Sequence, residues 1–194
     1  WGSRRTTTRS LSRCHYAGAA YSLASYLDAY PDSRIFGGKN FILGGSFANE
    51  LQLPRDVKVG DLSATLIDRI TPLVNLVRIP SKRIALMADW SEKLPALVEA
   101  SARADVRSLS GVPSWFLTVL KGVVAREGAD SLAQVWPNLE VFFHGGIAFT
   151  PYRKQYEQLI TSPNMHYMET YNASEGFFGL QDDPSDPAMS LMVD

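Results

Sequence analysis

Short apolar runs alternate along the chain with longer amphipathic stretches, and this order predicts alternating strands and helices. Runs at 40–43, 105–109, 139–143 and 165–170 have the length of strands. The run at 139–143 is apolar at nearly every position, which is typical of a strand buried on both faces of a parallel sheet. We therefore predict an α/β fold, with a mostly parallel sheet flanked by helices on both faces.

The segments between these runs repeat apolar residues at spacings of three and four, as amphipathic helices do. Helices are predicted over 12–30, 61–70, 82–104, 113–127, 131–136 and 150–160. Pro95 lies inside the third of them, so we expect a kink or two helices there. Asp61 and Thr150 stand where side chains cap helix starts, and Gly128 stands where a glycine ends a helix. The apolar run at 73–79 is predicted to join the core, with the wall of a pocket as the alternative.

Composition narrows the class of protein. A chain of 194 residues is one domain or two small ones, and its net charge of −1 gives no reason to expect nucleic acid or an acidic membrane as a partner. Cys14 is the only cysteine, which fits a reducing compartment and predicts a cytoplasmic location. No apolar run approaches the roughly 20 residues of a membrane span. The missing initiator Met and the strand-like run at the end favour a piece of a longer chain.

Polar groups gather just after two of the predicted strands. Open α/β sheets bind ligands outside the carboxyl ends of their strands. Gly145 and Gly146 have no Cβ and let the backbone approach a flat ligand. Tyr171 offers a ring that can stack on a base, Ser174 a hydroxyl for a phosphate oxygen, and Glu175 a hard oxygen suited to Mg²⁺. Together they suit a magnesium nucleotide, although a simple Gly-Gly turn and a helix cap at 171–175 remain open alternatives.

Other catalytic patterns fit less well. The sequence has no G-x-S-x-G motif of the serine hydrolases. His15, His144 and His166 are scattered rather than clustered at metal-ligand spacing. The sequence Gly-Gly-Ser at 44–46 lacks the spacing of a phosphate loop, so we interpret it as an ordinary loop. The acidic residues at 182–186 are interpreted as a solvated turn.

Six blocks of sequence resemble, in the same order, bacterial members of the Gretchen Hagen (auxin-responsive promoter) family of the acyl-adenylate-forming superfamily. The blocks are CHYAG at 14–18, GDLSA at 60–64, IALM at 84–87, SGVPSW at 110–115, VFFHGGIAFTPYRKQYEQLI at 141–160 and MHYMETYNASEGFFGLQDDP at 165–184. The resemblance covers 12–194. It implies that this segment is part of the large N-terminal domain of an acyl-adenylate-forming enzyme, without the C-terminal domain.

The resemblance also implies an activity and a set of site residues. Family members use ATP and Mg²⁺ to convert an acyl acid into an acyl-adenylate and pyrophosphate, after which an amino acid amine displaces AMP. The implied catalytic residues are Ser174 at the α-phosphate and Glu175 at Mg²⁺. The implied ATP-binding residues are Gly145, Gly146, Tyr171, Asn172, Ala173, Ser174, Thr6 and Thr7. The implied acyl-acid residues are Ser110, Val112, Trp115 and His144, for which a purely structural role of His144 stays open.

The N-terminus departs from the family pattern. The family opens with a phosphate loop of the type S-S-G-T-T, whereas this chain reads GSRRTTTRS at 2–10. Thr6 and Thr7 remain, but the glycine before the threonine pair is lost, and residues 1–11 are predicted to be a degraded, disordered loop. This change favours a second hypothesis, a non-catalytic remnant that binds nucleotide weakly or only packs against a partner. Thioester formation with coenzyme A is the alternative within the enzyme class.

Overall fold

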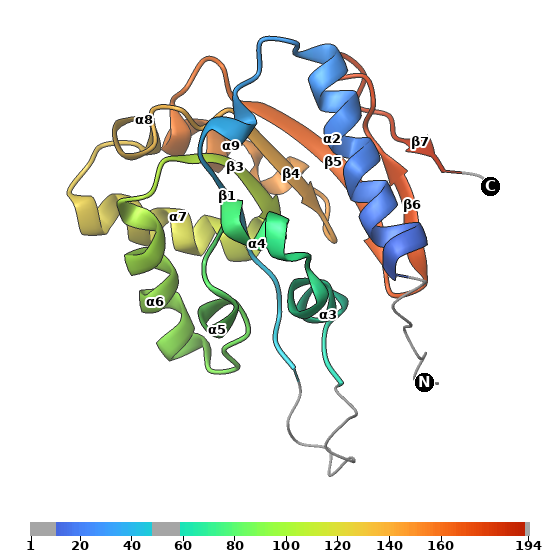
Figure 1. Ribbon diagram of the computed structural model, residues 1–194. Coiled ribbons are helices and arrows are strands. Elements are labelled where there is room, and N and C mark those ends of the chain that lie inside the picture. The colour runs from blue at the N-terminus through green and yellow to red at the C-terminus, as the bar shows by residue number, and fades with distance from the viewer. Residues whose placement is uncertain (1–10, 48–58, 193–194) are drawn as a thin grey trace.

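A mixed sheet forms the centre of the computed structural model, which describes residues 11–47 and 59–192 (Figure 1). Within these residues the sheet has seven strands in the order β2-β1-β3-β4-β5-β6-β7. They are β1 (Lys39–Ile42), β2 (Arg78–Ile79), β3 (Val106–Gly111), β4 (Val141–Gly145), β5 (His166–Ala173), β6 (Gly176–Leu180) and β7 (Ser190–Leu191). The strands from β2 to β5 are parallel, and β6 and β7 are antiparallel to their neighbours. The predicted mostly parallel α/β fold is confirmed.

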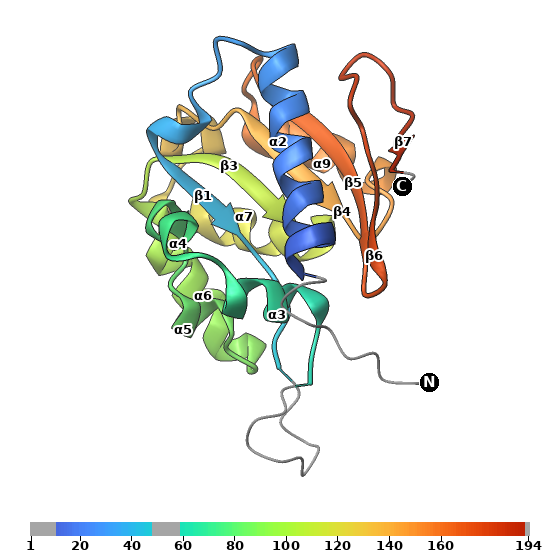
Figure 2. The same ribbon diagram turned by 45° about the vertical axis from the view of Figure 1, so that its right-hand side comes forward.

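Helices cover both faces of this sheet (Figure 2). They are α2 (Ala17–Ala29), α3 (Leu62–Arg69), α4 (Pro72–Val77), α5 (Lys82–Ala85), α6 (Trp90–Ala102), α7 (Pro113–Glu127), α8 (Leu132–Val135) and α9 (Thr150–Ile160). A π-helical turn, η1 (Leu11–Tyr16), leads into α2, and a 3-10 turn, η2 (Ile35–Gly37), precedes β1. No helix in the described part of the chain is long and apolar enough to cross a membrane.

The core lies in two layers, one on each side of the sheet. Phe41, Leu109 and Phe142 belong to the larger cluster, which joins α6, α7 and α9 to one face. Val141 belongs to the smaller cluster on the other face, together with Tyr26 of α2. Successive strand residues point to opposite faces, so Val141 and Phe142 serve different layers, and both are fully buried. This double burial explains the nearly continuous apolar run that predicted β4.

Three predicted helix features differ in the structure. The helix predicted over 82–104 is two helices, but the break falls at 86–89 rather than at Pro95, because Asp89 caps α6 by accepting a hydrogen bond from Ser91 N at 2.8 Å. Thr150 is the first residue of α9 and not its cap, which is Phe149. Asp61 stands at the cap position of α3 but makes no capping hydrogen bond. Gly128 ends α7 in the left-handed conformation, as predicted, with φ 61°.

Most of the apolar run at 73–79 is not core. Residues 73–77 lie in the short helix α4, where Leu73 and Leu76 are 78% and 69% exposed, and only Ile79 of the edge strand β2 packs against the larger core cluster. Among the described residues β2 pairs only with β1, so α4 lies at the edge of the sheet, and none of its residues is buried.

Three strands run further than predicted. Ser110 and Gly111 complete β3, Gly145 completes β4, and β5 continues through Ala173. The predictions that placed residues 110–111, Gly145 and residues 171–173 in loops are therefore wrong. Pairing with a neighbouring strand extends each of them, and for β5 that neighbour is the antiparallel strand β6.

Candidate functional site

The predicted site residues converge on the edge of the sheet where the parallel strands end. Ser110 of β3 is in register with Phe143 of β4, and the next residue, Gly111, is in register with His144. Gly145 of β4 is in register with Thr170 of β5. The tip of the β5–β6 hairpin lies at the lower end of the sheet in both ribbon views (Figures 1 and 2).

The two glycines at the end of β4 are required by local geometry. A Cβ on Gly145 would lie 2.2 Å from the backbone oxygen of Thr170, so only glycine lets β4 pack this closely on β5. Thr170 strengthens the same contact by donating from Oγ1 to His144 O at 3.2 Å. Gly146 has φ +82°, which favours glycine, and its Cβ would approach Val112 at 3.4 Å. The Gly-Gly turn therefore lies beside Val112. This contact places two predicted ATP-binding residues next to a predicted acyl-acid residue.

Residues 171–175 form the end of a β-hairpin. Asn172 is in register with Phe177 and Ala173 with Gly176, so Ser174 and Glu175 are the two turn residues, and both are exposed. The pairing skips one residue of β6 beside Tyr171, an irregularity of the kind that re-aims side chains near binding sites. The open alternative of a helix cap at this position is wrong, because no helix begins there.

Tyr171 presents an accessible ring. Its side chain is 50% exposed, and its ring centroid lies 5.4 Å from that of Phe178 at a tilt of 40°. One partner therefore orients the ring while much of its surface stays open to a flat ligand.

The N-terminal turn fastens this hairpin, a role that the sequence analysis missed. His15 is 4% exposed, and its Nδ1 lies 2.7 Å from Asn172 Oδ1. The backbone N–H of Phe177 donates to Cys14 Sγ at 3.0 Å. Gly18 lets α2 approach Phe177, whose ring atoms would lie 2.2 Å from a Cβ at that position. The CHYAG block, which holds all three residues, was the available signal, but its partners lie more than 150 residues away in the sequence.

His144 is buried at 2% exposure and stacks on Phe149 with ring centroids 4.2 Å apart. Burial, with a smaller contribution from the charge of Arg153, lowers the pKa of His144 to about 4. Its Nδ1 has no hydrogen-bond partner among the described residues. The stacking supports the structural role that stayed open for His144, and its unpaired Nδ1 is itself buried.

The other predicted acyl-acid residues lie where β3 passes into α7. Ser110 and Val112 are half-buried, and Trp115 in the first turn of α7 is 37% exposed. Tyr156 of α9 fixes this junction by donating from its hydroxyl to Pro113 O at 2.8 Å. Thr6 and Thr7 lie outside the described residues.

The metal prediction depends on Glu175. Among the described residues there is no cluster of three or more His, Cys, Asp or Glu side chains that could hold a metal ion. Protein-bound Mg²⁺ commonly takes one or two carboxylates and completes its shell with waters and substrate phosphates. A single exposed carboxylate next to the Ser174 hydroxyl therefore fits a metal that arrives with a nucleotide.

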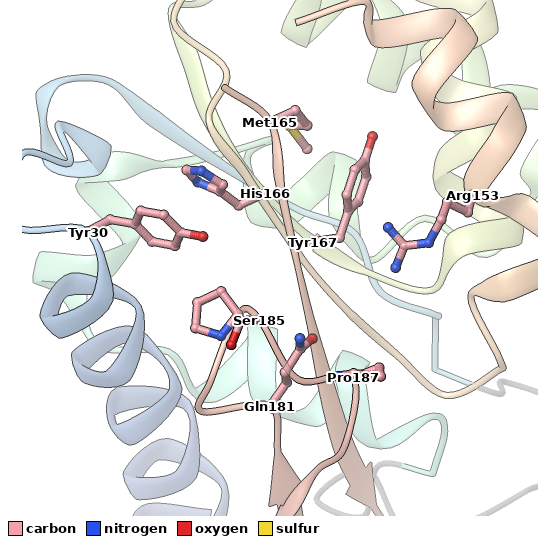
Figure 3. Close-up of a pocket in the computed structure, with 9 residues that line it drawn as sticks. Tyr30, Arg153, Met165, His166, Tyr167, Gln181, Ser185 and Pro187 are labelled. Atoms are coloured by element: carbon pink, nitrogen blue, oxygen red, sulfur yellow. The ribbon is translucent and has the colours of Figure 1, made fainter. Parts of the chain in front are cut away.

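A cavity of about 260 Å³ lies at the other end of β5 (Figure 3). Tyr30 and His166 lie on one side of it, and Arg153 and Tyr167 on the other. Its lining residues are Tyr30, Arg153, Met165, His166, Tyr167, Gln181, Pro184, Ser185 and Pro187. None of them is a predicted site residue, so this cavity is separate from the candidate site.

The chain is similar to known proteins in both sequence and fold. A family model described as the GH3 family N-terminal domain matches residues 23–165. Among solved structures, one described as "GH3.15 acyl acid amido synthetase" superposes with a TM-score of 0.66 at 15% sequence identity. The match covers 96% of this chain and 42% of that chain, so these residues span less than half of the matched protein. The comparison with curated proteins finds no match.

Proposed function

Because the chain belongs to the GH3 family, we propose that the complete protein containing these residues is an ATP-dependent acyl acid–amido synthetase. The observation that carries the proposal is the meeting of the Gly145-Gly146 turn and the Tyr171–Glu175 hairpin at the carboxyl edge of the sheet. The superposition on an amido synthetase over 96% of the chain supports it. The acid and the amino acid are small-molecule substrates.

The reaction has two steps. A carboxylate oxygen of the acid attacks the α-phosphorus of ATP, and the bond to pyrophosphate breaks. The amine nitrogen of an amino acid then attacks the acyl carbon, loses a proton, and AMP leaves. No covalent bond to the protein forms, so the protein contributes by positioning and by stabilising charge.

The hairpin supplies the nucleotide side. The half-exposed ring of Tyr171 stacks on adenine, with the Gly145-Gly146 backbone and residues Asn172 and Ala173 alongside it. Ser174 donates its hydroxyl to the α-phosphate, where negative charge builds up as pyrophosphate leaves. Glu175 would hold Mg²⁺, which would supply neutralisation of the phosphate charge.

The β3–α7 junction supplies the acid side. Ser110, Val112 and Trp115 form a wall beside the Gly-Gly turn, so the acid lies next to the α-phosphate. His144 faces the acid without a charge, because its lowered pKa keeps the imidazole neutral at pH 7. A neutral imidazole can orient the acid by a hydrogen bond without trapping its carboxylate in an ion pair.

A non-catalytic nucleotide-binding role is the second candidate. The observation that favours it is the sequence GSRRTTTRS at 2–10, in which Arg5 stands directly before the threonine pair, where a phosphate-wrapping loop needs glycine. Thr6 and Thr7 would then bind the outer phosphates weakly.

The test is ATP–pyrophosphate exchange by the complete gene product, with Mg²⁺ and a panel of aliphatic and aromatic carboxylic acids. Exchange that depends on one class of acid is the expected result, and mass spectrometry with amino acids or coenzyme A then distinguishes amide from thioester products. Tight Mg-ATP binding by a folded protein that exchanges with no acid would favour the second candidate.

A further inference from the structure

Lys93 is a buried lysine on which the charge of Asp61 acts. It lies in α6 at 3% exposure, and its ammonium donates to Gly44 O at 2.9 Å and to Gly45 O at 3.4 Å. Lysines are almost never fully buried unless they are paired. No ion pair within 4.0 Å joins Lys93 to any of the described residues. This buried charge therefore calls for an explanation.

The carbonyls that Lys93 binds belong to the segment 44–46, which leaves β1 at the carboxyl edge of the sheet. Ser63 Oγ accepts a hydrogen bond from Gly45 N at 2.9 Å, and Asp61 N donates to Ser46 O at 3.3 Å. A Cβ on Gly45 would lie 1.7 Å from the Asp61 carboxylate. The GDLSA block thus holds the segment from one side, and Lys93 holds it from the other.

Leu43, the residue directly before this segment, adjoins the proposed acid wall. Leu43 N donates to Ser110 O at 2.9 Å. A Cβ on Gly111 would lie 2.7 Å from Leu43 O, so the two backbones are in close contact. A shift of the segment 44–46 would therefore move the residues against which Ser110 and Gly111 pack.

We propose that Lys93 is a positioning residue for the acid side of the site. It fixes the segment 44–46 against the β3–α7 junction through its hydrogen bonds to Gly44 O and Gly45 O. The segment 44–46 and the GDLSA block would then help to hold the acid side of the site in place. The inference rests on the proposed function for its kinetic consequence, but not for its structural part.

The structural part is tested by hydrogen exchange of residues 39–47 in the complete gene product. Lys93→Met keeps the length and burial of the side chain but removes the charge and the donor. We expect hydrogen exchange in the segment 44–46 to become about tenfold faster. This factor corresponds to the loss of one hydrogen bond from a charged donor. Lys121→Met is the matched control, because the exposed Lys121 bonds only to Gln155. Unchanged exchange in folded Lys93→Met would overturn the proposal.

The kinetic part uses pyrophosphate exchange with benzoate and decanoate as probe acids. We expect Lys93→Met to raise the KM for the acid about tenfold while the KM for ATP stays unchanged, and Lys93→Arg to recover part of the loss. Faster hydrogen exchange with an unchanged KM for the acid would reduce Lys93 to a structural residue and overturn the proposal. A wild-type protein that shows no ATP–pyrophosphate exchange would instead refute the proposed function. Calorimetric titration of the two acids would then test the proposal for Lys93 directly. Weaker acid binding by Lys93→Met than by the wild type would support it, and equal binding would overturn it.

Discussion

At the scale of single residues, the surroundings of His144 keep its imidazole neutral over the physiological pH range. The folded protein holds the pKa near 4, below the ordinary value of 6.5, because charging the ring would leave a cation buried against Phe149. The unfolded chain therefore binds a proton between these values that the folded chain does not. By linkage, His144 stabilises the fold above pH 6.5, and this stabilisation is lost as the pH falls towards 4.

The lowered pKa of His144 predicts how the stability of the fold depends on pH. Lowering the pH from 7 to 4 should reduce the free energy of unfolding by up to about 3 kcal/mol through His144. His144→Phe keeps a ring stacked on Phe149 and removes the titrating group, so its stability should fall less over the same range. Urea denaturation of both proteins at several pH values measures the difference. Parallel pH profiles would show that His144 does not contribute in this way.

A second prediction concerns Tyr171. If its half-exposed ring stacks on adenine, Tyr171→Ala should raise the KM for ATP about tenfold or more, since stacking of a base on an aromatic ring contributes about 1–3 kcal/mol. Tyr171→Phe keeps the ring and should retain most of the affinity. Equal losses in the two variants would show that the hydroxyl matters and the stacking does not.

At the scale of elements, residue patterns located most helices and strands but not all of their ends. The bounds of α7 follow from Pro113 at its start and Gly128 at its end, both of which act locally. The end of β5 depends instead on pairing with β6, which comes later in the chain. The exposure of Leu73 depends on the position of β2 at the sheet edge, which apolarity alone does not reveal.

The candidate site was predictable to the same degree. The strand-end pattern and the family resemblance both pointed to the Gly-Gly turn and residues 171–175, and strand order explains why these two segments meet. The contact between His15 and Asn172 was not predictable, because it joins residues 157 positions apart that no local pattern connects. The burial of Lys93 was hidden for the same reason.

The His15–Asn172 contact predicts coupling between the N-terminal turn and the hairpin. A double-mutant cycle with His15→Ala and Asn172→Ala should give an interaction free energy of about 1 kcal/mol in denaturation experiments. The same two variants should also raise the KM for ATP, because the hairpin carries Tyr171 and Ser174. Strictly additive effects on stability would show that the two elements are independent.

At the scale of the whole molecule, the two-layer core and the exposed helix α4 should respond very differently to substitution. Phe142 is fully buried, so Phe142→Ala should cost about 3–5 kcal/mol. Leu73→Lys and Leu76→Lys should each change stability by less than about 0.5 kcal/mol, because both side chains are exposed. Thermal or urea denaturation of the complete gene product provides the measurement. A large loss in the α4 variants would mean that another part of the protein covers this helix.

The two-residue turn between β5 and β6 has a consequence for how this protein can vary in length. Ser174 and Glu175 are adjacent at the tip of a paired hairpin, so the extended strand sets the distance from Tyr171 to each of them. Adding or deleting one residue between them would turn the following side chains to the opposite face of the sheet. Residue identity at the tip can therefore be exchanged one position at a time, whereas the strand fixes the distance from the Tyr171 ring to the turn residues.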